Sequence, residues 1–439
     1  MAGPGSDTAT EDGLLKNTYE PVIAEAVLNK FSLKDTFKPK PSPWDGGRGK
    51  IWSAHVDRNN SFQATGQDGA IPDPDNEKYI DGFITQRKGM GRWRVTQEQL
   101  DDSANKEGAY RSTRTENMER FIDNVSYRQE FWLGTDGRSV FALINEASPS
   151  TNTTLIVDSP GGIAGANAGN RFMKVGMYIA AINPANGAIR AGICRITACS
   201  SDGLNVTVDA APNAAWADND YIVQCANSTV TDAQDTSYEK APWGIEALID
   251  DGTYRDNYFG VQRSLYPNFQ SYVSASTGAL SFDLMQRVSD IVNQKLDGEI
   301  DQIWCHHSIR RVYILLTQAD RRYSGSALMN PDGGTVAFRQ KDLTMGEVEI
   351  KALRTAPLAT MFLVDSKGAD AVRYVSEAGK WVSNPTSGEI LIRVGSGSTA
   401  RHAWEAWWYT RYQLFMRNPG KCARIDGLTG QTFTMVRGE

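Results

Sequence analysis

The amino-acid sequence predicts an α+β fold that carries an inserted small all-β domain. Between Tyr238 and Val394, amphipathic helical patterns alternate with short apolar runs typical of strands. Between Phe172 and Ala226, by contrast, short apolar runs recur about every ten residues, with Asn-Gly, Asp-Gly and Pro-Asn turns between them. This second pattern indicates a small antiparallel barrel or sandwich inserted into a mixed domain.

Residues 1–44 are expected to form an N-terminal arm. Residues 1–13 are small and polar, which is typical of a mobile start. Leu14–Phe31 places apolar residues on one face of an amphipathic helix. Lys38–Trp44 contains a proline at every second position, so we expect an extended segment rather than a core element.

Residues 45–96 predict a long β-hairpin. Lys50–Asp57 and Lys78–Thr96 are rich in β-branched and aromatic residues, as strands are. Arg58–Glu77 between them contains glycines and prolines among polar residues, which is loop chemistry. The tip of this hairpin therefore has almost no apolar content.

Gln97–Leu133 has helical character, contains no proline and is followed by Gly134, which is placed to end the helix. At about 1.5 Å per residue, the helix would span roughly 55 Å. Apolar residues at helical spacing occur only in its second half: Met118, Phe121, Ile122, Val125 and Trp132. The polar half and the hairpin therefore need partners, which other copies of the chain would supply. This indicates an assembly protein rather than a self-contained enzyme.

We divide the remaining chain at residues 97–149, 150–230, 231–399 and 400–439. The all-β segment, 150–230, includes a Gly- and Ala-rich loop and four apolar runs: Phe172–Ile182, Ile189–Thr197, Leu204–Val208 and Tyr221–Cys225. Helices are expected at Phe282–Leu296, closed by Gly298, and at Ile309–Ala319. Strands are expected at Val140–Ile144, Ile300–Cys305, Val348–Leu353, Met361–Val364 and Glu389–Val394. Trp404–Met416 alternates strictly, which predicts a long strand paired through Asn418-Pro419-Gly420 with Lys421–Ile425.

Composition excludes several classes of protein. The chain has 46 basic and 52 acidic residues, a formal net charge of −6, which argues against tight coating of nucleic acid. It has no run of 18 apolar residues, and Met1–Lys16 lacks the layout of a signal peptide. Its five cysteines are odd in number and lack CxxC spacing, so we expect a reduced, intracellular chain without disulfides.

Two clusters could suggest chemistry, but a structural role explains each better. Cys305, His306 and His307 are adjacent, whereas a zinc site needs four convergent ligands; packed or capping histidines before a helix are the stronger interpretation. Asp250 and Asp251 could form a catalytic carboxylate pair, yet Asp-Gly after an apolar stretch is first a turn.

The glycine-rich and aromatic segments also favour structural roles. Gly46–Lys50 lacks the spacing of a phosphate-binding loop and is better read as a hinge at the hairpin base. Residues 161–169 lack the strand and helix that dinucleotide binding requires. The aromatic cluster of Trp404, Trp407, Trp408 and Tyr409 could stack sugars or bases, but alternation favours core on one face and interface on the other. We therefore predict no catalytic, cofactor-binding or metal-binding residues.

The order of these elements resembles the major capsid proteins of tailed bacteriophages, the HK-ninety-seven-type fold. The local phrases that carry the resemblance are Trp243-Gly-Ile-Glu-Ala-Leu-Ile-Asp-Asp-Gly-Thr, Tyr258-Phe-Gly-Val-Gln-Arg-Ser with Pro267 following, Ile303–Arg310, Ala403-Trp-Glu-Ala and Arg417-Asn-Pro-Gly. The match covers 236–430 by phrase and 38–135 by layout. The segment 150–230 resembles the small barrels that some of these proteins insert.

The resemblance implies roles for the segments. Asp45–Thr96 would be the extended loop that laps over a neighbouring subunit, and Gln97–Leu133 the spine helix of a peripheral domain. Tyr238–Thr399 would hold the axial domain, and Ala400–Ile425 would return as a peripheral-domain hairpin. Some relatives join a lysine of the extended loop covalently to a neighbour's asparagine. This chain has no lysine between Ile51 and Glu77, so we expect a shell without such cross-links.

We therefore expect a major capsid protein, without enzymatic activity or cofactor, that forms the icosahedral shell of a double-stranded DNA phage. Its partners would be other copies in hexamers and pentamers, a scaffolding protein and a portal, with a decoration protein left open. It would touch packaged DNA weakly and non-specifically, contact no membrane, assemble in the host cytoplasm and reside in the virion. The alternatives are an encapsulin-like compartment shell and, in a different class, a β-rich binding module or hydrolase.

Overall fold

The computed structural model describes residues 36–41, 49–67, 69–104, 113–147, 149–163, 168–232, 235–321, 344–345, 348–382, 390–394 and 401–430. The chain divides into two compact units. The first comprises residues 1–46, 86–133 and 372–414. The second comprises residues 47–85, 134–371 and 415–439.

The described residues of the first unit form a five-stranded sheet and two helices. The strands are β1 (Lys38–Pro41), β4 (Arg87–Thr96), β18 (Ala371–Val382), β19 (Ile392–Arg393) and β20 (Ala403–Met416). β20 pairs with β18, β19 and β4, and β1 adds to β18 as a parallel edge strand. Prolines are tolerated at such an edge because they need not donate to a second neighbour. Helix α2 (Gln97–Ala104) follows β4 directly, and α3 (Thr113–Leu133) packs on the sheet.

The apolar stripe predicted for the second half of the helix is confirmed as core. Met118 and Ile122 of α3 are buried in one cluster with Trp381 and Trp408 of the sheet. Glycines in β4 provide the space: a Cβ at Gly91 would lie 2.5 Å from the ring of Phe121, and one at Gly89 would lie 3.0 Å from Trp132. The backbone of β4 therefore approaches the helix closely.

The structure differs from the sequence-based prediction at three places in this region. Lys78–Thr96 is not one hairpin strand, because its second half, β4, pairs with β20 over ten residues of its own chain. The predicted helix Gln97–Leu133 comprises α2 and α3, and residues 105–112 between them lie outside the described residues. The helix does end at Leu133, but Gly134 does not take the left-handed conformation. A Cβ there would lie 2.4 Å from the carbonyl oxygen of Thr355, so close backbone approach requires this glycine.

The second unit contains a six-stranded sheet in the order β13-β21-β17-β14-β16-β15. The strands are β13 (Tyr272–Gly278), β14 (Gln302–Cys305), β15 (Thr344–Met345), β16 (Val348–Ala352), β17 (Met361–Val364) and β21 (Ala423–Leu428). Helices α5 (Phe282–Leu296) and α6 (His307–Arg321) share a buried apolar cluster with it. The predicted bounds of α5 and β17 match those observed.

Two predictions about chain reversals are wrong. Helix α5 ends at Asp297, which takes the left-handed conformation (φ 57°), rather than at Gly298. The expected hairpin of Trp404–Met416 with Lys421–Ile425 does not form. Instead β21 lies parallel to β13 and antiparallel to β17, in a different sheet from β20. Residues Pro419–Lys421 form a 3₁₀ turn that redirects the chain rather than folding it back on itself.

Six strands of the second unit close into an antiparallel barrel. They are β5 (Val140–Ile144), β6 (Thr154–Asp158), β7 (Tyr178–Ile182), β8 (Cys194–Cys199), β9 (Asn205–Val208) and β10 (Tyr221–Gln224). Val140, Ala180, Ile182 and Val223 fill part of its interior. The short strands expected between 172 and 226 are thus present. β5 also belongs to the barrel, although it precedes the segment 150–230.

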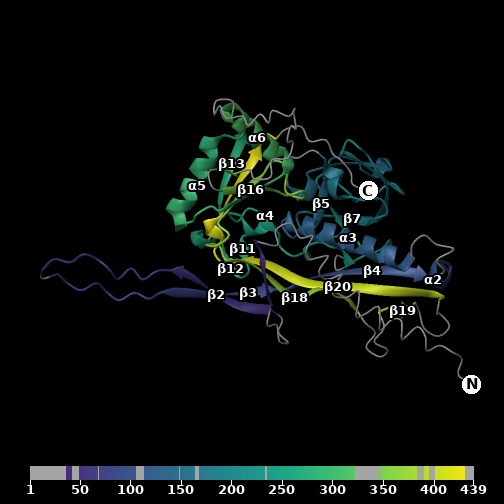
Figure 1. Ribbon diagram of the computed structural model, residues 1–439, viewed down its shortest axis with the longest axis horizontal. Helices are drawn as coiled ribbons and strands as arrows, with labels where there is room; N and C mark the ends of the chain where they lie inside the picture. The colour runs from purple at the N-terminus through teal and green to yellow at the C-terminus, as the bar shows by residue number, and fades with distance from the viewer. Residues whose placement is uncertain are drawn as a thin grey trace, which may run out of the picture. The chain divides into compact units, whose positions relative to one another are not determined.

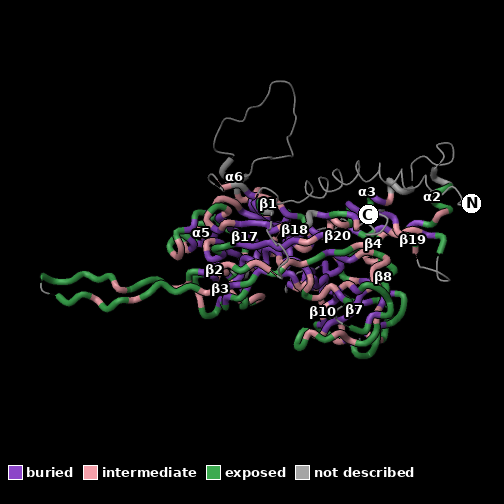
Figure 2. The backbone as a smooth tube through the Cα atoms, turned by 90° about the horizontal axis from the view of Figure 1, so that it is seen from below, coloured by how far each residue is buried: buried purple, intermediate pink, exposed green. Residues whose placement is uncertain are grey.

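Short elements complete the described part of the second unit. They are α4 (Ile245–Leu248), β11 (Asn257–Tyr258), β12 (Val261–Gln262) and the 3₁₀ turns Pro149–Thr151, Pro160–Gly162, Gly169–Phe172 and Pro267–Phe269. Strands β2 (Gly49–Asp57) and β3 (Lys78–Thr85) form an antiparallel hairpin that extends away from the rest of this unit (Figures 1 and 2). Among the described residues, no helix combines the length and the apolar character needed to span a bilayer.

Candidate assembly surfaces and a buried charge cluster

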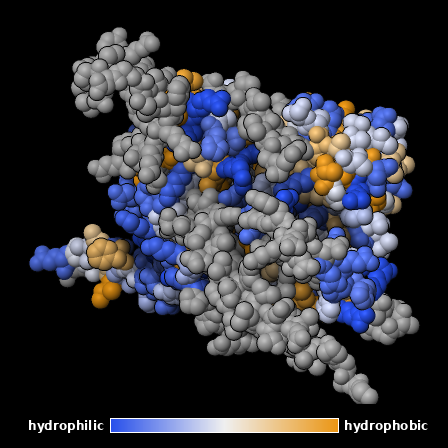
Figure 3. All heavy atoms as spheres, turned by 45° about the vertical axis from the view of Figure 1, so that its right-hand side comes forward, coloured by the Kyte–Doolittle hydropathy of each residue, from blue (hydrophilic) through white to orange (hydrophobic). Residues whose placement is uncertain are grey.

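The hairpin tip is residues 58–77, and nearly all of its described residues, 58–67 and 69–77, are exposed to solvent (Figure 2). Phe62 is 97% exposed and Ile71 is 91% exposed, and Figure 3 shows apolar atoms of this hairpin beside hydrophilic ones. Single exposed apolar side chains are common on a monomer, but two that are almost fully exposed on one projecting hairpin are available for contact with a partner. The tip therefore presents apolar side chains that the described residues do not cover.

Polar bonds hold the two arms of the tip together. Asn59 donates its side-chain amide to the carbonyl of Asp75 at 2.6 Å, and the backbone N–H of Asn60 donates to the carboxylate of Asp75 at 3.2 Å. Hydrogen bonds from backbone N–H groups lower the pKa of Asp75, and the contact with His55 lowers the pKa of Glu77. Both carboxylates are ionised at neutral pH, so the tip is acidic.

The base of the hairpin, by contrast, is anchored in the second unit. The Trp52 ring lies 4.9 Å from that of Phe415 and 5.8 Å from that of Phe269. The backbone N–H of Phe83 donates to the carbonyl of Phe259 at 2.6 Å. A Cβ at Gly82 would lie 2.5 Å from that same carbonyl oxygen, so the contact requires glycine. The base of the hairpin is therefore held by apolar packing, while its mostly polar tip is exposed to solvent.

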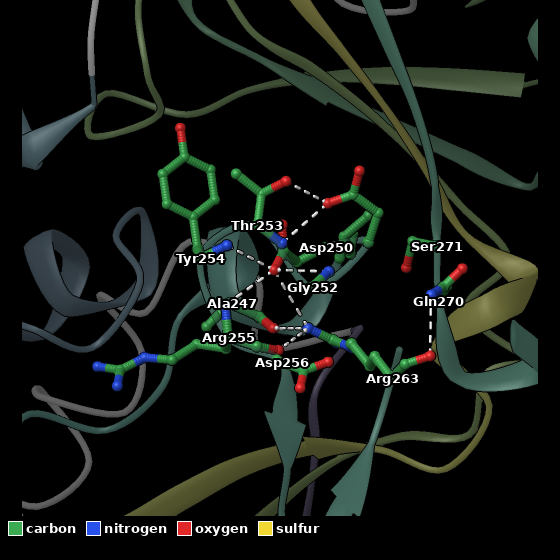
Figure 4. A network of polar contacts seen from close by, with 12 residues as sticks. Ala247, Asp250, Gly252, Thr253, Tyr254, Arg255, Asp256, Arg263, Gln270 and Ser271 are labelled. Atoms are coloured by element: carbon green, nitrogen blue, oxygen red, sulfur yellow. Dashed lines mark hydrogen bonds and ion pairs between the residues drawn. The ribbon is translucent and has the colours of Figure 1, made fainter. Parts of the chain in front are cut away.

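Asp250 and Arg263 form the centre of a buried network (Figure 4). One carboxylate oxygen of Asp250 accepts hydrogen bonds from the backbone N–H groups of Gly252, Tyr254 and Arg255 at 2.9–3.1 Å. The same oxygen lies 3.5 Å from the guanidinium of Arg263. The turn predicted for Asp250-Asp251-Gly is therefore confirmed, with its first carboxylate bound inside the protein.

Arg263 and Arg424 bind several separate segments. Arg263 donates to the carbonyl oxygens of four residues at 2.7–3.1 Å: Ala247, Leu248, Arg255 and Phe269. Arg424 donates to the carboxylate of Asp426 at 2.9 Å and lies within 3.4 Å of carboxylate oxygens of Glu246 and Asp250. Glu246, Asp250, Arg263, Arg424 and Asp426 are termed the buried charge cluster below.

The buried charge cluster links three segments of the chain: α4 with the residues that follow it, the residue after β12, and strand β21. Burial raises the pKa of Glu246 to about 8, so this carboxyl group is largely protonated at neutral pH. Sequence reasoning missed both arginines. Arg263 lies within one of the segments that carry the resemblance, and Arg424 lies four residues after another. Arginine is ordinarily a surface residue, however, and no local sequence pattern predicts its burial.

His306 has the capping role that the sequence predicts, whereas His307 is exposed. Nδ1 of His306 accepts the backbone N–H of Ser308 at 3.1 Å, so His306 caps the N-terminus of α6. Burial lowers the pKa of His306 to about 3, which keeps the ring neutral and able to accept. Within the described ranges, no three His, Cys, Asp or Glu side chains gather as metal ligands would.

The glycine-rich segments pack against neighbouring backbone. Gly161 and Gly162 take the left-handed conformation in a 3₁₀ turn, and a Cβ at Gly169 would lie 2.5 Å from the backbone of Val157. Residues 164–167 of this segment, and Gly46–Arg48 of the other, lie outside the described residues. Gly49 begins β2, where a Cβ would lie 2.4 Å from the ring of Phe83.

The aromatic cluster of β20 divides between two faces. Trp408 is buried in the cluster beneath α3, whereas Trp407, its neighbour in sequence, is 39% exposed on the opposite face. Core packing on one face is therefore confirmed. The exposed face of the sheet joins the hairpin tip as a candidate assembly surface.

Comparison with known proteins identifies the fold. No family model and no curated protein sequence matches the chain. Among solved structures it is similar to a chain of the cyanophage A-1(L) capsid asymmetric unit, with a TM-score of 0.52 and 9% identity over 87% of this chain and 89% of that one. It is also similar to the capsid of the native GTA particle (TM-score 0.44, 8% identity, 91% of each chain).

A further similarity is to the holo-SrpI encapsulin complex from Synechococcus elongatus (TM-score 0.39, 11% identity, 91% of this chain and 89% of that one). The cyanophage match carries the conclusion, because it superposes most of both chains at a TM-score above one half. The resemblance inferred from the order of elements is confirmed at this level: the chain has the fold of a phage capsid protein.

Proposed function

We propose that this chain is the major capsid protein of a double-stranded DNA phage and that it assembles into the phage's icosahedral shell. The observation that carries the proposal is the β2–β3 hairpin, whose acidic tip leaves the side chains of Phe62 and Ile71 almost fully exposed. These exposed side chains add nothing to the stability of an isolated subunit. Covering each side chain on a neighbour would contribute about 1.5–3 kcal/mol.

The mechanism is repeated contact between copies. Each subunit offers one hairpin to a neighbour and receives one from another neighbour, so the contacts form rings rather than a closed pair. In an icosahedral shell these rings would be hexamers and pentamers. Individually modest contacts give a stable shell when every subunit makes several of them at once. Because the base of the hairpin is anchored, the tip is presented without a large ordering cost.

In this proposal the first unit corresponds to the peripheral domain and the six-stranded sheet with α5 and α6 to the axial domain. The barrel would be the inserted domain. The chain would have no catalytic activity and no cofactor. A scaffolding protein and a portal would act in assembly, and the enclosed DNA would be touched weakly, in keeping with a net charge of −6.

The test is to express the full chain with a scaffolding protein and examine it by negative-stain electron microscopy. We expect closed shells of uniform size. Shells that protect DNA from nuclease would support a phage capsid, whereas shells filled with an enzyme would indicate an encapsulin-like compartment. Monomers at high protein concentration that bind sugars would indicate a binding module and would end the proposal.

A further inference from the structure

Three segments of the second unit meet beside the start of helix α6. The guanidinium group of Arg171, in the 3₁₀ turn that precedes β7, donates to the carbonyl oxygen of Ala356 at 3.0 Å and to that of Arg354. The hydroxyl group of Ser308, in the first turn of α6, donates to the carbonyl oxygen of Leu358 at 3.1 Å. The 3₁₀ turn, the start of α6 and the loop between β16 and β17 therefore hold one another in place.

The segments that meet here carry only positive charge. Residues 168–174, 305–311 and 353–358 contain five arginines and lysines and no carboxylate, which gives a net charge of +5. We term five residues of these segments the basic junction: Arg171, His307, Arg310, Arg311 and Arg354. Three of the five, His307, Arg311 and Arg354, are exposed to solvent, so the basic junction is accessible to a partner.

The cations of the basic junction repel one another. Helix α6 has no acidic residue in its first turn, and Arg310 and Arg311 lie at its start instead. The N-terminus of a helix carries a partial positive charge, so cations there lower its stability. Partial burial and the four arginines lower the pKa of His307, so each arginine lies near enough to act on the ring. A bound anion would offset this repulsion.

The chemistry of the basic junction favours nucleic acid over protein as the partner. None of the exposed large apolar side chains of the described residues falls in the three segments. Protein interfaces have an apolar core, whereas interfaces with nucleic acid are more polar and much more positively charged. A planar guanidinium group can bind a phosphate through two hydrogen bonds. His307 and Arg311 lie one helical turn apart, about 5–6 Å, so they can face the repeated phosphates of a polymer.

We propose that the basic junction binds the phosphate backbone of duplex DNA. Arg311 and Arg354 contact phosphate oxygens, and Arg171, fixed by its two carbonyl bonds, adds positive charge beside them. Such contacts read no base sequence, because they touch only the backbone. A few of them give weak, salt-sensitive binding, which agrees with a chain of net charge −6. This inference rests on the proposed function, since it names where the shell protein touches the DNA that the shell encloses.

The experiment measures binding of a labelled duplex of about 20 base pairs to the full chain by fluorescence anisotropy, between about 50 and 200 mM salt. In Arg311→Gln/Arg354→Gln the dissociation constant at low salt should rise about tenfold or more. The slope of log K against log salt should become shallower by about two, because each lost phosphate contact removes about 0.9. Arg311→Lys/Arg354→Lys keeps the charge and should keep the slope. The matched control, Arg287→Gln/Lys367→Gln, removes two exposed cations elsewhere in the same unit and should bind as wild type.

Nuclear magnetic resonance of the histidine side chains tests where the duplex binds. Bound phosphate offsets the charge of the arginines, so the pKa of the His307 ring should rise in the complex. His307→Asn identifies the resonance of this ring. A purely structural role of Arg311 and Arg354 would not produce this change. Circular dichroism and thermal melting establish that each variant is folded.

Equal binding of the duplex by Arg311→Gln/Arg354→Gln and by the control would overturn the inference, as would binding that leaves the pKa of His307 unchanged. So would a wild-type chain that binds pyrophosphate or polyglutamate through these residues but does not bind the duplex. Closed shells that protect DNA would leave the proposed function intact in each of these cases. Duplex binding through the basic junction by a chain that never closes into shells would support the inference and contradict the proposed function instead.

Discussion

The guanidinium group of Arg424 lies 3.3 Å from a carboxylate oxygen of Glu246, and neither oxygen of that carboxylate accepts a hydrogen bond from the described residues. Both side chains are shielded from water. A buried carboxylate without donors is poorly solvated, and Asp250 and Asp426 already face the same arginine. Glu246 is thus the member of the buried charge cluster that a proton stabilises.

Stability of the subunit should therefore depend on the protonation of Glu246. Its pKa of about 8 in the folded state lies above the ordinary value of 4.5, so the folded state binds this proton more tightly than the unfolded state does. The corresponding stabilisation is fully present below 4.5 and is lost as the pH rises through about 8. Glu246→Gln keeps the shape but cannot ionise. The free energy of unfolding, measured in urea, should be similar for the variant and wild type near pH 5. Near pH 9 the variant should be more stable by about a few kcal/mol.

The control for this experiment is Glu239→Gln, the same chemical change at a carboxylate that is half exposed beside Arg255. That variant should follow the wild-type pH profile. If the profiles of wild type and Glu246→Gln run parallel between these pH values, Glu246 is not the titrating group.

Arg263 should be the most sensitive single position of the buried charge cluster. Arg263→Lys keeps the charge, but an ammonium group cannot reach the four carbonyl oxygens that the guanidinium serves. Leaving them unsatisfied beside Asp250 should lower the free energy of unfolding by about 3–5 kcal/mol. Arg287→Lys on the exposed surface of α5 is the control. A loss below about 1 kcal/mol in Arg263→Lys would show that the network rearranges around lysine.

Local periodicity predicted α5, whose packing is one-sided, because the buried residues of Phe282–Leu296 fall at helical spacing. Met361–Val364 is buried at every position and has no periodicity, so it matched β17 because a run of four apolar residues is too short for a helix. The same logic failed for β18, which we did not predict. Arg373 is buried in that strand, and Gly379 leaves room for the ring of Trp408, so neither follows the usual alternation.

Pairing between distant segments could not be predicted from local signals. Asn418-Pro419-Gly420 marked the end of β20, but the predicted hairpin was wrong because β13, which pairs with β21, lies about 150 residues earlier in the chain. The buried charge cluster has the same origin, because its members come from three segments. The exposed tip, in contrast, was predicted from Arg58–Glu77 itself, since a segment with few apolar residues has little to bury.

Deleting the tip should abolish assembly while leaving the subunit intact. Asp57 and Lys78 are paired residues at the end of the hairpin ladder, so Asn-Gly can replace residues 58–77 as a two-residue turn. Because the tip contributes little to the core, the melting temperature of the subunit should change by only about 1–2 °C. Light scattering should then show subunits that remain unassembled.

A length-matched variant, Phe62→Ser/Ile71→Ser, separates the loss of the tip from the loss of its apolar anchors. It should also melt as wild type does and assemble less well. A large fall in the melting temperature of the deletion variant would show that the tip packs in the core of its own chain.

The mature shell should contain no covalent bonds between subunits. A lysine can attack a neighbour's side chain only as the neutral amine. The chain has no lysine between Ile51 and Glu77, and Lys78 is held 2.7 Å from the carboxylate of Asp57, which raises the pKa of its ammonium group. Particles boiled in detergent should therefore give one band near the chain mass of 48.3 kDa on a denaturing gel. Particles treated first with an amine-reactive cross-linker provide the positive control, and ladders of dimers and hexamers from untreated particles would contradict the prediction.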